Sequence, residues 1–240
     1  MRWNKVLVII LILISLIVFF SCSYLLLKDF FELKENNEAT ENLIEDSIQI
    51  DKETQETTID WNYLKSVNDD IIGWIEIEST NINYPILKDK NLYYLKHSFD
   101  RKYNNNGSIF TTNKSPFIDD ETIIYGHNMK NESMFSNLGK YLNKDFLDSH
   151  SKIKIYTPEC NYKGTIFSVY SIGIETESNN IKSLSFNERI NYYQKASKYN
   201  MKNNDEICKI VKLSTCSYIN SRTIPTDQRY YILANIIPID

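Results

Sequence analysis

The sequence predicts a mainly β fold, a mixed or antiparallel barrel with inserted helices, behind an N-terminal membrane helix. Three observations lead to this prediction: an uncharged N-terminal run, a series of short apolar strand patterns after residue 61, and amphipathic helical patterns set between those strands. The strands and helices do not alternate regularly, as a parallel βαβ sheet would require. At 240 residues, the chain has room for one domain of ordinary size and an additional terminal segment.

The N-terminal run VLVIILILISLIVFFSCSYLLL, residues 6–27, has no charged residue and is long enough to cross a hydrocarbon core of about 30 Å. Arg2 and Lys5 precede it and acidic residues follow it. The positive-inside bias therefore places residues 1–5 in the cytoplasm and the rest of the chain outside the cell. A cleaved signal peptide and a lipid-modified Cys22 are the alternatives. The run is longer than a signal core, lacks a small-x-small cleavage site, and carries phenylalanines where a lipoprotein signal would not.

Residues 28–60 form an acidic segment that accounts for the negative charge of the chain. It holds eleven acidic residues against three lysines, whereas the whole chain has a net charge of −4. Its apolar residues are too sparse to bury a continuous face, so we expect a partly helical or disordered spacer. Because the acidity belongs to the spacer and no basic run is present, a nucleic-acid partner is not expected.

Denser hydrophobicity begins at Trp61, and we expect residues 61–240 to fold as one extracellular domain. Helical spacing of apolar residues predicts helices, and alternation or short apolar runs predict strands. The expected helices lie in WNYLKSVND, SMFSNLGKYLNKDFLDSH and SFNERINYYQKASKYN. The expected strands lie in IIGWIEI, NINYPIL, GSIFTT, ETIIYGH, KIKIYTP, YKGTIFSVYSIGIE, EICKIVKLSTC and RYYILANIIPI.

Three histidines are candidates for a catalytic base. His97 and His150 lie in polar segments near element ends, where a solvated surface histidine is the usual reading. His127 directly follows ETIIYG, so an apolar strand delivers it to the start of a loop. Scaffolds position catalytic side chains at such strand ends, although a structural histidine fits the same pattern.

The cysteines outside the membrane run are three, Cys160, Cys208 and Cys216, and an odd number leaves at least one thiol free. Cys216 follows the apolar run KIVKL, which ends at Leu213, and lies among serine and threonine, which suits a nucleophile as well as a packed thiol. Cys208 has the apolar neighbours of a structural cysteine, and Cys160 in TPECNYKG is typical of a hairpin turn. A nucleophilic thiol needs a base or cation, which a histidine can supply. No metal-ligand spacing is present, so we expect neither zinc nor another cofactor.

These segments together resemble a known family. IIGWIEI, TNINYPIL, NLYYL, GSIF, IIYGHNM, MFSNL and LSTC, in this order and followed by the arginine-led strand RYYILA, look like a class B sortase. Class B sortases are membrane-anchored cysteine transpeptidases, and the resemblance covers roughly residues 61–239. It implies an eight-stranded β-barrel. It also implies that the enzyme cuts surface proteins after the threonine of a C-terminal sorting motif, forms a thioester, and transfers the protein to an amine of peptidoglycan or of a pilin.

The resemblance assigns the nucleophile to Cys216, the acid and base to His127, and the oxyanion-stabilising arginine to Arg229. A backbone N–H, that of Ser217, is the second expected oxyanion donor. Arg222 is the alternative arginine, and Arg229 is favoured because a strand holds it more rigidly than a loop does.

For the sorting peptide, the resemblance implies contacts from a small set of residues. These are Asn91, Leu95, Ser214, Thr215 and Ser217, with Asn180 and Ile181 lining the same groove. A papain-like protease would carry its cysteine before its histidine, which is the reverse of the order here. A purely hydrolytic cysteine peptidase and a non-enzymatic surface adhesin or sensor remain the alternative functions.

Overall fold

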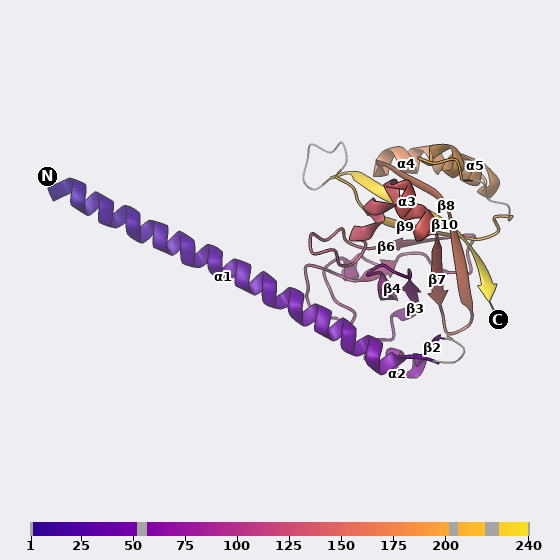
Figure 1. Cartoon of the computed structure of the whole chain (residues 1–240), viewed down its shortest axis with the longest axis horizontal. Coiled ribbons are helices and arrows are strands. Elements are labelled where there is room, and N and C mark those ends of the chain that lie inside the picture. Colours follow the sequence, from indigo (N-terminus) through magenta and orange to yellow (C-terminus); the bar gives the residue numbers. More distant parts are fainter. Residues whose placement is uncertain (1, 52–56, 202–205, 219–225, 240) are drawn as a thin grey trace. The chain divides into compact units, whose positions relative to one another are not determined.

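The computed structural model describes residues 2–51, 57–201, 206–218 and 226–239 (Figure 1). The chain forms two compact units, residues 1–48 and residues 49–240. The first unit consists of helix α1 (Arg2–Ser47), which is long and apolar enough to cross a membrane by length and composition.

Helix α1 continues beyond the uncharged run into the acidic segment. Two ion pairs lie along this part of the helix, each between residues four apart in the sequence: Lys28–Glu32 at 3.6 Å and Lys34–Glu38 at 3.5 Å. Such pairs stabilise a helix modestly. The first part of the segment predicted as a partly helical spacer is therefore helical as far as Ser47.

The second unit contains the predicted barrel. Its strands are β3 (Ile71–Glu76), β4 (Asn83–Lys88), β5 (Ile109–Thr111), β6 (Glu121–Tyr125), β7 (Lys152–Tyr156), β8 (Asn161–Gly173), β9 (Ile210–Cys216) and β10 (Gln228–Ile239). The described strands close in the order β10-β8-β7-β3-β4-β5-β6-β9, which confirms the eight-stranded barrel. The barrel is mixed, because β4–β5 and β6–β9 are parallel pairs and the other pairs are antiparallel. A separate two-stranded sheet joins β1 (Ile48–Ile50) to β2 (Thr57–Ile59).

The barrel interior is filled by apolar side chains that alternate with outward residues along each strand. Ile75, Ile86, Leu213 and Ile232 are completely buried in one core cluster. An eight-stranded barrel is just wide enough for side chains to fill it. The functional surface must therefore lie at the barrel's edge or outer face, not in its interior.

Helices pack around this barrel. They are α2 (Trp61–Val67), the 3₁₀ helices η1 (Tyr93–Leu95) and η2 (Ser136–Leu142), α3 (Lys144–Ser149), α4 (Ile174–Ile181) and α5 (Phe186–Ala196). The single helix predicted across residues 133–150 is two pieces, η2 and α3. The break lies at Asn143, whose side chain caps α3 by accepting from the N–H groups of Asp145 and Phe146.

Helix α4 was not predicted, because the sequence pattern of β8 continues without interruption into IGIE. Strand β8 ends at Gly173, and two glutamates in the first turn of α4 suit its positive N-terminal end. The predicted helix that follows is confirmed as α5, whose start carries a capping box of Ser185 and Glu188. Both helices contact β8, and Figure 1 shows them together on that side of the barrel.

Candidate active site

The register of three neighbouring strands brings the predicted catalytic residues to one edge of the barrel. Strands β6 and β9 are parallel, and Tyr125 pairs with Ser214. His127 and Cys216 each lie two residues beyond that pair, at the carboxyl ends of their strands. On the other side of β9, Arg229 at the start of antiparallel β10 pairs directly with Cys216.

Side-chain hydrogen bonds tie these strand ends together. The Thr215 hydroxyl donates to the Gly126 carbonyl at 2.7 Å, and the Asn128 amide donates to the Cys216 carbonyl at 2.7 Å. The backbone N–H of Phe135 donates to the His127 carbonyl at 2.9 Å. The backbone that carries the histidine and the cysteine is thus fixed on both sides.

A cleft of about 460 Å³ opens at this edge, and His127, Cys216 and Arg229 all line it. Its wall is largely apolar, with Leu92, Leu95, Phe110, Ile123, Tyr125, Ile174, Ile181 and Tyr231. A mostly apolar groove with a few convergent polar groups is typical of a peptide or small-ligand site. Burial raises the pKa of Tyr125 and of Tyr231, so both present neutral phenols to the cleft.

A backbone carbonyl orients His127. The ring atom Nε2 lies 2.7 Å from the Leu95 oxygen. Because a carbonyl oxygen can only accept, Nε2 carries a proton in this arrangement, and Nδ1 is left as the atom that gains or loses one.

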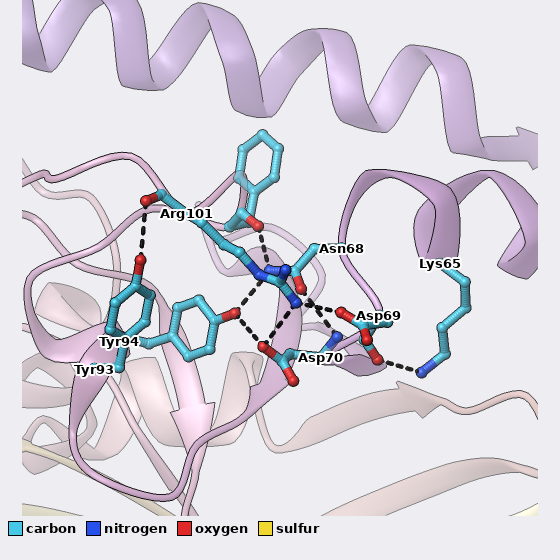
Figure 2. A network of polar contacts seen from close by, with 8 residues as sticks. Lys65, Asn68, Asp69, Asp70, Tyr93, Tyr94 and Arg101 are labelled. Carbon is cyan, nitrogen blue, oxygen red and sulfur yellow. Dashed lines mark hydrogen bonds and ion pairs between the residues drawn. The ribbon is translucent and has the colours of Figure 1, made fainter.

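A polar network around Tyr94, shown in Figure 2, holds the segment that supplies this carbonyl. The Asn68 amide donates to the Tyr94 hydroxyl at 2.8 Å, and that hydroxyl donates to the Asp70 carboxylate at 2.7 Å. Arg101 also binds Asp70, at 3.2 Å, and its carbonyl accepts from the Tyr93 hydroxyl at 3.1 Å. The network joins the start of β3 to η1, the 3₁₀ turn that ends at Leu95.

Arg229 is oriented by its own neighbourhood. Its Nη1 donates to the carbonyls of Thr226 and Gln228, each at 2.9 Å. These two bonds fix one side of the guanidinium fork beside Cys216. The alternative, Arg222, lies outside the described residues.

The predicted peptide contacts divide into two groups. Leu95, Ser214, Thr215 and Ile181 line the cleft. Asn91 is exposed but is not among the cleft-lining residues, and Asn180 donates to the Tyr192 hydroxyl at 3.1 Å.

Ser217 differs from its expected place. It is completely buried, its N–H donates to the Gln228 carbonyl at 2.9 Å, and its hydroxyl bonds to that of Ser171. The amide expected as an oxyanion donor is therefore engaged in the β9–β10 pairing, because the strand contact continues past Cys216.

The other cysteines and histidines lie elsewhere. Cys160 is at the turn between β7 and β8, as predicted, with its carbonyl accepting from the N–H of Thr157. Cys208 was expected to be packed but is exposed, because β9 begins only at Ile210. His97 stacks on Tyr93 and His150 on Phe146, and neither lines the cleft.

Two charged residues of the cleft were missed by sequence reasoning. Lys212 and Glu177 both line it and form an ion pair although they are only 1% and 3% exposed. A lysine inside the apolar run KIVKL was a usable signal, because lysine is almost never fully buried unless paired. Burial lowers the pKa of Lys212.

Adjacent strand ends of this mixed eight-stranded barrel bring a cysteine, a histidine and an arginine to one cleft. This combination of residues is typical of an enzyme that transfers acyl groups through a cysteine. The chain belongs to the sortase family: the family's Sortase domain matches residues 75–237. Sortases are cysteine transpeptidases, so the chain is a member of an enzyme family.

The similar proteins are sortase B proteins. The chain is 29% identical to Sortase B of Staphylococcus aureus over the full length of both chains. It is 47% identical to Sortase B of Listeria monocytogenes over 110 residues, which are 45% of each chain. Among solved structures, a Staphylococcus aureus sortase B-substrate complex superimposes with a TM-score of 0.70 at 26% identity, covering 88% of this chain and all of that one.

Proposed function

We propose that this chain is a membrane-anchored transpeptidase that cleaves surface proteins after the threonine of a C-terminal sorting motif and transfers them to an amine. The observation that carries the proposal is the pairing of Cys216 with Arg229, next to β6, whose end leads directly to His127. The acceptor is an amine of peptidoglycan or of a pilin. A similar sortase B, that of Staphylococcus aureus, has been solved in complex with a substrate, which supports a substrate-binding role for this chain.

In the proposed reaction, the Cys216 thiolate attacks the threonine carbonyl and gives a tetrahedral oxyanion. Arg229 donates to that oxyanion from a position held by two carbonyls. Preorganised donors of this kind typically lower a barrier by about 2.7–4 kcal/mol each. The Ser217 N–H is committed to Gln228, so Arg229 carries this role in our proposal.

Collapse of the intermediate breaks the peptide bond, and His127 as imidazolium gives a proton from Nδ1 to the leaving amine. The products of this half-reaction are a thioester on Cys216 and a free amine. Neutral His127 then takes a proton from the incoming amine as it attacks the thioester. The Leu95 carbonyl keeps the ring oriented in both steps, because Nε2 stays protonated throughout.

The peptide itself would lie along the cleft, with Leu95 and Leu92 on one side and Ser214 and Thr215 near the nucleophile. Leu92 and Leu95 are exposed apolar side chains, at 55% and 38%, that a bound peptide would cover. Asn91 remains a candidate contact from the exposed loop beside them.

The test uses the full chain in detergent micelles with a set of candidate sorting peptides. We expect cleavage and a thioester mass on Cys216, both abolished in Cys216→Ala. The matched control is Cys208→Ala, since Cys208 is exposed and lies outside the cleft. A folded chain that forms no thioester and cleaves none of these peptides contradicts the proposal.

Two further measurements separate the alternatives. Added oligoglycine should divert the product from the free acid to the amine adduct, whereas a purely hydrolytic peptidase would give only the acid. In a non-enzymatic adhesin or sensor, an alkylating agent would modify Cys216 at a rate no higher than in the denatured chain.

We also propose that α1 anchors the protein with its N-terminus in the cytoplasm and the barrel outside. Its length and apolar composition support an anchor, and Arg2 and Lys5 support the orientation. A membrane-impermeant maleimide applied to intact cells should label exposed Cys208. Labelling of Cys208 only after lysis would show that the barrel lies in the cytoplasm, the opposite orientation.

A further inference from the structure

Helix α4 forms one wall of the cleft, and its apolar contact with the barrel is small: Ile181, which is partly buried, packs against a core cluster. Ile174, Ser178 and Ile181 of this helix line the cleft. Among its eight residues, all of which the structure describes, only Glu177 is buried. A helix of two turns is not stable by itself in water. Its position on the barrel therefore depends largely on what Glu177 contacts, with a smaller share from Ile181.

The Glu177 carboxylate receives hydrogen bonds from three different elements. Lys212 of β9 and the Tyr170 hydroxyl of β8 bind Oε1, the latter at 2.6 Å. The Tyr192 hydroxyl of α5 binds Oε2 at 2.9 Å. One carboxylate thus links α4 to two barrel strands and to the neighbouring helix.

Lys212 is enclosed by aromatic rings. Its Nζ lies 4.6 Å from the ring centre of Tyr193 and 4.3 Å from that of Tyr231, within the range of cation–π attraction. Side chains alternate along a strand, so Lys212 is on the same face of β9 as Ser214 and Cys216. The ion pair therefore connects α4 directly to the strand that carries the nucleophile.

A buried ion pair is weak evidence for stability, because desolvation of both charges offsets most of their attraction. What such a pair specifies well is geometry: Lys212 must meet Glu177 in one arrangement, since breaking the pair would leave a buried charge. This favours a role in positioning over a role in overall stability.

We propose that Glu177 and Lys212 are a positioning pair that fixes the α4 wall of the cleft and so sets the fit of the sorting peptide. The pair does not take part in bond making or breaking. This proposal rests on the proposed function only in that the occupant of the cleft is a peptide.

A second, partly buried pair of similar chemistry provides the control. Glu121 of β6 lies 3.6 Å from the Nε of Arg189, and accepts from the Tyr193 hydroxyl at 3.0 Å. Neither Glu121 nor Arg189 lines the cleft. Glu121→Gln therefore removes a partly buried carboxylate that lies outside the cleft and that borders the Lys212 site only through the shared Tyr193 side chain.

The kinetic test compares Glu177→Gln, Lys212→Met and Glu121→Gln in the full chain. We expect the first two to raise the KM for the sorting peptide about tenfold or more, as the loss of a charge-assisted hydrogen bond allows, with kcat within about threefold. Alkylation of Cys216 by iodoacetamide should keep its wild-type rate, and Glu121→Gln should leave KM unchanged. The double variant Glu177→Met/Lys212→Met should regain thermal stability but keep the raised KM.

A second readout does not depend on turnover. Hydrogen exchange in α4, including the Lys182 N–H that bonds to the Ser178 carbonyl, should accelerate in Glu177→Gln and Lys212→Met and not in Glu121→Gln. Unchanged exchange, or a fall in kcat with KM unaltered, overturns the positioning role. If wild-type protein cleaves no peptide, the proposed function fails, while the exchange result still decides whether the pair anchors α4.

Discussion

Gly107 offers a test of the claim that the Leu95 carbonyl holds His127. Its φ is +58°, in the left-handed region that glycine adopts without cost. A Cβ added there would lie 2.6 Å from the Leu95 oxygen and 2.6 Å from the Tyr94 oxygen. Gly107→Ala therefore presses on the same atom that accepts from the histidine ring.

The size of the effect follows from these distances. An ordinary contact of a Cβ begins at 3.4 Å, so the methyl group and the Leu95 oxygen must separate by about 0.8 Å. If the oxygen takes up that shift by moving directly away from His127, its 2.7 Å distance to Nε2 reaches about 3.5 Å, where a hydrogen bond is nearly lost. Misplacement of a catalytic group by about 1 Å can cost about a hundredfold in rate. We expect kcat/KM to fall about 10- to 100-fold, and stability to fall by about 1–3 kcal/mol from the alanine in a left-handed conformation.

The assay is steady-state cleavage of a sorting peptide by the full chain, together with the rate of Cys216 alkylation and a thermal melt. Alkylation should slow as well, because a displaced imidazolium no longer stabilises the thiolate. Gly139→Ala is the control: its new Cβ would meet the ring of Tyr230 at 3.3 Å, away from the cleft. If folded Gly107→Ala keeps kcat/KM and alkylation within twofold of wild type, the Leu95 carbonyl does not position the histidine.

Three other substitutions probe the site and its support. Arg229→Ala should lower kcat/KM about 100- to 1000-fold as an oxyanion donor is lost, whereas Arg222→Ala should change it by less than about threefold; the reverse order of effects would make Arg222 the essential arginine. Burial raises the pKa of Tyr94 from 10.0 to about 12. The unfolded chain therefore loses the phenol proton at a lower pH than the folded chain, and the free energy of unfolding falls between pH 10 and 12. In urea titrations at several pH values, Tyr94→Phe should reduce the slope of this fall by up to the equivalent of one proton per molecule, and equal slopes in the variant and the wild type would contradict the assignment. Gly126→Ala would press a Cβ against the Ile109 side chain and bring it within 2.8 Å of the Phe135 ring, so we expect a loss of about 1–3 kcal/mol in the free energy of unfolding by urea. A loss under about 0.5 kcal/mol would show that both side chains can move aside.

The strands, and the placement of His127 and Cys216 at strand ends, could be predicted because they depend on local patterns of apolar residues. Each residue follows an apolar run, and such runs mark buried strands. That β6 lies parallel to β9 is not a local property. The pairing of Tyr125 with Ser214 joins residues far apart in the sequence, so the proximity of the two strand ends needed either the structure or a family resemblance.

The features that sequence reasoning missed depend on tertiary contacts. Nothing in the pattern of IGIE separates the end of β8 from the start of α4. The burial of Glu177 against Lys212 is a contact between distant parts of the chain, which the local sequence does not show. Ser217 was expected at the oxyanion because it follows the nucleophile, yet strand pairing extends one residue further and takes its N–H. Cys208 looked packed because its neighbours are apolar, and it is exposed because the strand begins two residues later.

The cleft is thus supported in two different ways, and the difference predicts how variation in it should behave. Around Cys216, backbone carbonyls hold the candidate catalytic residues: the Leu95 carbonyl accepts from the His127 ring, and the Cys216 carbonyl accepts from the Asn128 side-chain amide. Apart from the Asn128 side chain, these contacts use backbone acceptors, so the arrangement around Cys216 can persist while most neighbouring side chains change. The α4 wall instead depends on the side chains of Glu177 and Lys212. Substitutions in that pair can therefore alter which peptide is accepted without altering how its bond is broken.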